Sequence, residues 1–351
     1  MTGTKSLTVE GDPIALVITS PGGDPRPERG DGSQDGRKRA ADDSSIEVAF
    51  VNNMPDSALE ETELQFVGLL ESAARELGDL TVRVSRYWLP GLARNAAVAE
   101  RLDRNYSPLE RLYASGADGL IVTGTEPLTE NLREESYWEP LADLLNWAEV
   151  STKSTLLSCL AAHAAALLFD GIERHFLAAK FSGVFVQVIR TDHPLTTRLG
   201  RLVHMPHSRL NDLPTDLLQK DGYTNLIESP EMTWTVAVKD RGSCTFVLVQ
   251  GHPEYSTTSL LREYRRDLQR FLRGERTSVP SMPVGYLDHV SHRLLQNFEA
   301  QVLANPTDIE LMRAFPFEPV EQRLVNTWQH SAARLYANWL RLIESGRQCS
   351  A

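Results

Sequence analysis

Short apolar runs and amphipathic segments alternate along the middle of the chain. The apolar runs have the length of buried strands and lie at residues 46–52, 80–84, 118–123 and 155–158. Segments with helical spacing of apolar side chains lie at residues 59–77, 108–113, 137–147 and 160–169. Ser57 followed by Glu60 has the spacing of a capping box at the start of the first helix. This alternation predicts an α/β fold with a parallel, doubly wound sheet, which binds ligands outside the carboxyl ends of its strands.

After about residue 180 the pattern changes to strands with fewer helices. Candidate strands lie at residues 183–189, 202–204, 233–238 and 244–250. We expect several of them to be antiparallel additions to the sheet. Helical spacing returns at residues 257–272, 290–302 and 325–343.

The pattern divides the chain into three regions. Residues 1–44 include the sequence PGGDPRP and a polar, charged run, which predict a mostly disordered tail. An apolar patch at 14–18 interrupts that tail without an identifiable docking site. Residues 45–275 form the predicted main domain, and residues 276–351 are expected to form a helical extension packed on the same domain.

Composition excludes several classes of protein. The 351 residues are 41% hydrophobic, enough for a substantial core, and the formal net charge is −11. No long block of Lys and Arg is present, so we expect no nucleic-acid partner. The longest apolar stretch, around Cys159, is shorter than the roughly 20 residues of a membrane span, so we expect no membrane association.

Cysteine usage indicates a reducing compartment. Cys159, Cys244 and Cys349 are an odd number without C-x-x-C spacing, which argues against a disulfide framework or a zinc site. The first residues lack a signal-peptide pattern. We therefore expect a cytoplasmic protein with no bound metal or other cofactor.

Cys159 lies where a nucleophile is expected. The apolar run 155–157 stops just before it, and an Ala-rich helical segment follows at once, so the chain must turn sharply from strand to helix. Such a turn exposes its central side chain at the carboxyl end of the sheet, beside the free N–H groups of the next helix. Those groups favour negative charge and can stabilise an oxyanion. A buried structural cysteine is the alternative reading.

His252 and Glu254 supply the rest of a possible triad. His252 follows the apolar run 244–250, and Pro253 fixes the backbone between it and Glu254. A thiol nucleophile needs a base, and the base needs a third group to hold its tautomer and orientation. Taken singly, the histidine is also compatible with a structural role and the glutamate with a solvated carboxylate. Together with Cys159 they predict a catalytic triad.

Many short motifs in the right order resemble the homoserine O-acyltransferases, which transfer succinyl or acetyl groups and belong to the class I glutamine amidotransferase-like superfamily. The matching residues include Asn53-Met54-Pro55, 118–124, Tyr137-Trp138, Cys159, 180–185, 206–209, 251–255, Glu263-Tyr264, Arg266-Asp267, Trp328, His330 and 338–340. The resemblance covers nearly all of the predicted globular part. It implies a flavodoxin-like, mostly parallel sheet whose catalytic domain spans residues 45–275.

The resemblance also implies a chemistry. Cys159 resembles the family's acyl-accepting nucleophile, His252 its general base and Glu254 the partner of that histidine. The acyl group then passes from acyl-CoA to the cysteine as a thioester, and on to the hydroxyl of an amino acid, in a ping-pong sequence. Arg266 matches the residue expected to pair with the acceptor carboxylate, and Lys180 and Ser208 match substrate-binding positions. The alternative readings are a surface cation for Lys180 and Arg266 and a loop hydroxyl for Ser208. The partners are thus acyl-CoA and an amino acid, and the resemblance suggests a homodimer.

Some positions depart from the family pattern. Cys159 is followed by Leu-Ala-Ala-His instead of the usual Trp-Gly-Ala-Gln. His163 then either touches the site or fills the place of the glutamine in the packing, and we expect packing. The usual Met-Pro-Lys-Lys is Met54-Pro55-Asp56-Ser57, which removes a substrate-facing lysine. The position linked to the choice of acyl donor falls at Leu128 or Thr129, neither of which is the family's Gly or Glu, so the donor is left open.

These observations favour an acyl-CoA-dependent O-acyltransferase that acts on L-homoserine and feeds methionine synthesis. Three alternatives remain. One is the same chemistry on L-serine or another hydroxy amino acid, a second is a thiol hydrolase or amidase on the same scaffold, and a third is a non-catalytic, metabolite-binding protein.

Overall fold

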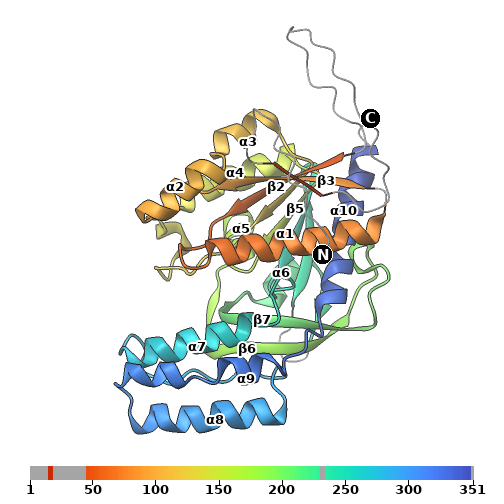
Figure 1. Cartoon of the computed structure of the whole chain (residues 1–351). Helices are drawn as coiled ribbons and strands as arrows, with labels where there is room; N and C mark the ends of the chain where they lie inside the picture. The colour runs from red at the N-terminus through yellow and green to blue at the C-terminus, as the bar shows by residue number, and fades with distance from the viewer. Residues whose placement is uncertain (1–14, 19–44, 79, 230–233, 349–351) are drawn as a thin grey trace, which may run out of the picture.

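The computed structural model describes residues 15–18, 45–78, 80–229 and 234–348 of the 351-residue chain. Within this part, ten strands form one sheet in the order β1-β3-β2-β4-β5-β10-β9-β8-β6-β7 (Figure 1). The strands are β1 (Ala15–Ile18), β2 (Ser45–Asn52), β3 (Thr81–Trp88), β4 (Gly119–Val122), β5 (Ser154–Ser158), β6 (His175–Ile189), β7 (Leu202–Asp212), β8 (Thr224–Glu228), β9 (Val236–Arg241) and β10 (Cys244–Val249). The α-helices are α1 (Leu59–Leu77), α2 (Ala96–Asn105), α3 (Leu109–Ser115), α4 (Trp138–Ser151), α5 (Leu160–Asp170), α6 (Thr215–Lys220), α7 (Ser259–Leu272), α8 (His289–Ala304), α9 (Phe317–Glu321) and α10 (Gln329–Gln348). Three 3-10 helices are η1 (Leu132–Glu134), η2 (Pro194–Thr196) and η3 (Ile309–Ala314).

Five neighbouring strands make a parallel half of the sheet. β2 pairs in parallel with β3 and with β4, and β5 continues the parallel arrangement between β4 and β10. Numbered in chain order, these five strands have the spatial order 2-1-3-4-5, which is the flavodoxin-like arrangement. The predicted doubly wound α/β fold is confirmed.

Helices cover both faces of this parallel half. Val48 and Phe50 of β2 belong to an apolar cluster that includes residues of α1, α7 and α10. Ala49 and Val51 of the same strand belong to a second cluster, which includes residues of α3, α4 and α5. Strands buried on both faces have continuous apolar runs, which is why the sequence pattern predicts them well.

The other half of the sheet is antiparallel. β9 pairs with β10, β8 with β9, and β6 with both β8 and β7, all in antiparallel register, which confirms the predicted additions. The β6–β7 hairpin is longer than the predicted strands 183–189 and 202–204. Its extra residues include Lys180 and Arg209, so no apolar run marks them. The short strand β8 lacks such a run too and is not predicted.

Two helix starts differ from expectation. The predicted capping box is wrong: α1 begins after Ala58, which offers no side-chain cap, and Ser57 is exposed. A turn replaces the cap, because the Ala58 N–H donates to the Pro55 carbonyl at 2.9 Å. The pattern also misses α2, in which Leu102 is the one buried residue. Asn95, whose side chain accepts from the third residue of that helix, was the available signal.

Both ends of the described chain pack on the same sheet. β1, from the apolar patch at 14–18, pairs antiparallel with β3. The rest of the predicted tail, and Cys349, lie outside the described residues. α10 contributes the indole N–H of Trp339, which donates to Ser154 Oγ of β5 at 3.0 Å.

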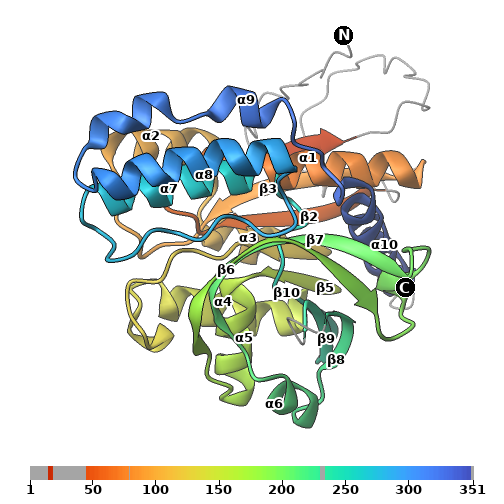
Figure 2. The same ribbon diagram turned by 90° about the horizontal axis from the view of Figure 1, so that it is seen from below.

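Figure 2 shows α7, α8 and α9 as a layer of neighbouring helices next to the β6–β7 hairpin. In the described ranges, no helix combines the length and apolar composition that crossing a membrane requires.

Candidate active site

Cys159 forms a sharp turn between β5 and α5. It has φ 50° and ψ −107°, a conformation that is strained for a residue with a side chain. Its N–H donates to the Val249 carbonyl of β10 at 2.7 Å, which fixes the turn against the neighbouring strand. The predicted strand-to-helix turn is confirmed, and it places the thiol at the carboxyl edge of the parallel strands.

The N-terminus of α5 lies against the end of β4. A Cβ atom added to Gly124 would lie 3.0 Å from the Leu160 nitrogen, so only glycine leaves this approach free. The N–H groups in the first turn of a helix have no partner inside the helix. The Leu160 N–H, next to the thiol in the chain, is therefore suited to stabilise an oxyanion.

His252 and Glu254 come together with Cys159. His252 Nδ1 lies 2.8 Å from Glu254 Oε1, and the imidazole also makes a hydrogen bond with Cys159. Burial lowers the pKa of His252, but the Glu254 carboxylate and Cys159 raise it, with a net result well above the usual value. Tyr255 stacks on the imidazole with ring centroids 4.3 Å apart, which restricts its rotation. The arrangement has the order expected of a carboxylate, a base and a nucleophile.

Gln250 and His163 form a second hydrogen-bonded pair, which contacts the thiol of Cys159. Gln250 Nε2 donates to Cys159 Sγ at 3.6 Å, and Gln250 Oε1 lies 2.5 Å from His163 Nε2. Burial lowers the pKa of His163 to about 3, so its imidazole is neutral at neutral pH and donates through Nε2. His163 therefore contacts the site through Gln250 as well as packing in the core. Gln250 follows the last residue of β10, but no motif in the sequence marks it as a candidate site residue.

Lys180 and Ser208 meet at one carboxylate. Lys180 Nζ lies 3.1 Å from Glu263 Oε2 and 2.8 Å from Asp267 Oδ2, and Ser208 donates a hydrogen bond to Glu263. Tyr255 donates its hydroxyl to the other Glu263 oxygen at 2.5 Å. Burial raises the pKa of Glu263, but these partners outweigh it and lower the pKa to about 2. Because Tyr255 also stacks on His252, this group adjoins the triad.

Arg266 lies on α7, one turn after Glu263. Its Nε is 3.5 Å from Asp267 Oδ1, and 46% of its side chain is exposed. The guanidinium thus lies beside the Lys180 group and retains access to solvent. In the sequence Glu263 and Asp267 are only parts of a motif, because their contacts with Lys180 depend on how α7 packs on β6.

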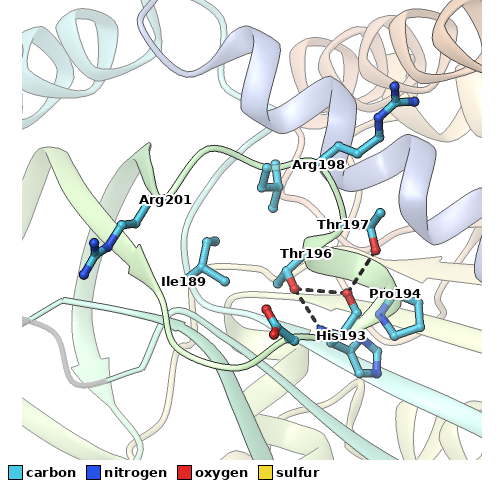
Figure 3. Close-up of a pocket in the computed structure, with 9 residues that line it drawn as sticks. Ile189, His193, Pro194, Thr196, Thr197, Arg198 and Arg201 are labelled. Carbon is cyan, nitrogen blue, oxygen red and sulfur yellow. Dashed lines mark hydrogen bonds between the residues drawn. The ribbon is translucent and has the colours of Figure 1, made fainter.

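A separate hollow of about 810 Å³ lies beside η2 and the loop between β6 and β7. His193 caps η2 through hydrogen bonds with Thr196 (Figure 3). Figure 3 also shows that the guanidinium groups of Arg198 and Arg201 point away from each other. No residue of the triad lines this hollow, so we place the candidate active site at Cys159. Among the described residues, no cluster of three or more His, Cys, Asp or Glu side chains is suited to hold a metal ion.

Known proteins match this chain over most of its length. A family model described as homoserine O-succinyltransferase matches residues 33–347. The homoserine O-succinyltransferase of Rhodopseudomonas palustris is 39% identical over 331 residues, covering 93% of this chain and 98% of that protein. The one of Bradyrhizobium japonicum is 40% identical over 311 residues, covering 89% and 94%. A solved glutamine amidotransferase from Methylobacillus flagellatus has a TM-score of 0.46 at 14% identity, covering 85% of this chain and 95% of that one. The chain belongs to the homoserine O-succinyltransferase family of acyltransferases.

Proposed function

We propose that this protein transfers a succinyl group from succinyl-CoA to the hydroxyl of L-homoserine, through a thioester on Cys159. The observation that carries the proposal is the hydrogen-bonded series from Glu254 to His252 to Cys159 at a strained turn. The names of the relatives favour succinyl over acetyl as the acyl group and homoserine as the acceptor. In this role the reaction serves methionine synthesis.

In the first half-reaction His252 removes the thiol proton, and the sulfur of Cys159 attacks the thioester carbonyl of succinyl-CoA. Negative charge develops on the carbonyl oxygen, and the Leu160 N–H at the start of α5 is suited to receive it. The C–S bond to CoA then breaks, and the imidazolium returns its proton to the departing thiolate. CoA leaves, and the succinyl group remains on Cys159.

The second half-reaction reverses these roles. His252 takes the proton of the acceptor hydroxyl, whose oxygen attacks the acyl carbon on Cys159. The C–S bond breaks, and the protonated imidazole returns a proton to the sulfur. Glu254 holds Nδ1 in both halves, so that Nε2 faces the reacting atoms.

In this proposal the residues beside Tyr255 bind the amino-acid acceptor. The half-exposed guanidinium of Arg266 is suited to a two-point grip on the amino-acid carboxylate. Lys180 and Ser208 are held by Glu263, which also accepts from Tyr255, the residue that stacks on His252. The acceptor hydroxyl thereby reaches the base from the α7 side.

L-serine is the second candidate acceptor, because the family's substrate-facing lysine is absent. In its place Asp56 binds Arg94 at 3.1 Å and accepts from the Asn95 N–H at 2.9 Å, so that loop is tied to its neighbour. Steady-state kinetics with succinyl-CoA and either acceptor tests the proposal. We expect parallel double-reciprocal lines, as for ping-pong transfer, and a higher kcat/KM for homoserine. Intersecting lines contradict the thioester route; a higher value for serine changes the acceptor, and release of free succinate alone indicates a hydrolase.

A further inference from the structure

Two arginine side chains of the β6–β7 region have buried N–H groups that lack a hydrogen-bond partner within the described part of the chain. These are Nε and Nη1 of Arg174 and the same two atoms of Arg209. The Arg209 side chain is only 3% exposed. A buried cation with unsatisfied donors is costly, so such groups indicate a place for an anionic ligand.

The β6–β7 hairpin brings the two guanidinium groups to one region. Arg174 directly precedes β6, and the register pairs its neighbour His175 with Asp212 of β7. Arg209 binds that same Asp212, at 2.9 Å through Nη2. β7, which carries Arg209, also adjoins the triad, because the Pro206 carbonyl accepts from the His252 N–H at 2.8 Å. Burial lowers the pKa of both arginines, and the charge of Cys159 acts in the opposite direction on each.

Protein carboxylates near these arginines are already engaged. Asp212 accepts from Arg209, from the Trp234 indole N–H and from a backbone N–H. Glu135 accepts from the N–H groups of Leu128 and Thr129 at 2.6 and 2.7 Å. The buried hydroxyl of Tyr137, which interacts electrostatically with Arg174, has no partner among the described residues either. Three groups that can donate hydrogen bonds thus lack a protein acceptor.

We propose that Arg174, with Arg209 and the Tyr137 hydroxyl, binds the free carboxylate of the succinyl group and so determines the acyl donor. This inference rests on the proposed transfer through Cys159. An arginine fork is matched to a carboxylate, and a succinyl group ends in a carboxylate where an acetyl group has none. The acceptor carboxylate is assigned to a different side of the site, at Arg266 on α7.

The same arginine connects the site to the loop after β4. Arg174 Nη2 donates to the carbonyls of Thr129 and Glu130 at 2.8 and 3.0 Å. Leu128 is 84% exposed, so its side chain contributes little to an enclosed acyl pocket. We therefore assign the choice of acyl donor to Arg174, which holds this loop, and not to the side chain of Leu128.

Binding of two CoA thioesters to the Cys159→Ala variant tests the inference. Succinyl-CoA and butyryl-CoA have acyl chains of equal length and differ in the terminal carboxylate. We expect titration calorimetry to show that Cys159→Ala binds succinyl-CoA roughly 100-fold more tightly than butyryl-CoA. Adding Arg174→Met should reduce this ratio to about threefold or less while the Kd for butyryl-CoA stays constant. Arg133→Met, which alters a half-exposed arginine on η1, is the matched control and should retain the ratio.

Tyr137→Phe is the second variant, because it leaves the contacts of Arg174 with the loop intact. It should lower the ratio about fivefold. The inference is overturned if no preference for succinyl-CoA exists at the start, or if the ratio survives in both Arg174→Met and Tyr137→Phe. It is also overturned if both variants weaken the binding of succinyl-CoA and butyryl-CoA equally. That result would mean that Arg174 binds the CoA part that the two ligands share, such as its phosphates. Failure of the transfer chemistry itself appears separately, as absence of a thioester on the wild-type protein.

Discussion

At the scale of single residues, the candidate site depends on how neighbouring groups set the protonation of His252. The imidazole is buried, which lowers its pKa, yet Glu254 and Cys159 raise that pKa well above the usual value. Position in the chain allowed all three residues to be predicted, since each closely follows the end of an apolar strand. Gln250 stands at the same strand end, but its contacts and those of Glu263 depend on side-chain packing between distant segments, so position in the chain alone does not mark them as candidates.

Replacing Glu254 by Gln should lower the pKa of His252, because the carboxylate that raises it is removed while burial remains. Proton NMR titration of the imidazole measures the change. Succinyl transfer should fall roughly 100-fold or more, since the amide no longer holds the correct tautomer. An unchanged pKa in the variant contradicts the assigned role of Glu254.

The same substitution has a pH-dependent effect on stability. Because the folded-state pKa of His252 lies above the ordinary value of 6.5, its protonation stabilises the fold fully below pH 6.5, and this contribution is lost as pH rises through the folded-state value. Urea unfolding should therefore show the largest difference between wild type and Glu254→Gln at low pH. A difference that grows with pH is the opposite of this expectation.

His163→Phe should leave the buried Gln250 carbonyl oxygen without its donor. We expect a loss of about 1–3 kcal/mol in the free energy of unfolding, together with slower alkylation of Cys159 by iodoacetamide. His163→Gln is the control, because an amide N–H can replace the imidazole N–H and the family usually carries glutamine there. Equal stability of the Phe variant and wild type refutes the role assigned to this pair.

At the scale of elements, predictability follows burial. β2, β4 and β5 are buried on both faces, and the apolar pattern predicts both ends of each strand to within one residue. α2 has a single buried residue, and the first part of β6 consists of exposed or half-buried residues. Neither segment therefore has a clear hydrophobic pattern in the sequence. The turn at Cys159 is predictable because no loop residues separate the strand from the helix.

Gly124→Ala tests the contact between β4 and the start of α5. The added methyl group would lie 3.0 Å from the Leu160 nitrogen and obstruct the N–H proposed to receive the oxyanion. We expect kcat to fall about 100-fold, a magnitude typical of losing one oxyanion donor, with a near-native circular dichroism spectrum. In the control Gly68→Ala, on α1, the added methyl has no atom within 4 Å, and activity should be retained. Full activity of Gly124→Ala rules out this oxyanion assignment.

At the scale of the whole molecule, the candidate site takes residues from the parallel half of the sheet, from its antiparallel half and from α7. Cys159 comes from the parallel strands, Lys180 and Ser208 from the β6–β7 hairpin, and Glu263 from α7. The first 44 residues lie mostly outside the described chain, so the predicted disorder there stays a prediction. The expected homodimer and cytoplasmic location also stay predictions.

Glu263 links three elements, and its ionisation should contribute to global stability. Its folded-state pKa of about 2 lies below the ordinary 4.5, so its contribution is present above pH 4.5 and lost as pH falls toward 2. The shift corresponds to about 3 kcal/mol. Urea unfolding at pH 6 and pH 3 should show a smaller acid-induced loss for Glu263→Gln than for wild type. Glu318→Gln, at an exposed position on α9, should behave as wild type; identical acid sensitivity of all three proteins contradicts the assignment.

The central claim is that Cys159 carries the acyl group between donor and acceptor, and intact-mass spectrometry of acid-quenched protein tests it most directly. With succinyl-CoA alone, the wild-type protein should gain one succinyl group, Cys159→Ala should gain none, and L-homoserine should discharge the adduct. With acetyl-CoA the adduct should form much more slowly. A wild-type protein that turns over both substrates without a mass increase, or an adduct that persists in Cys159→Ala, contradicts the account.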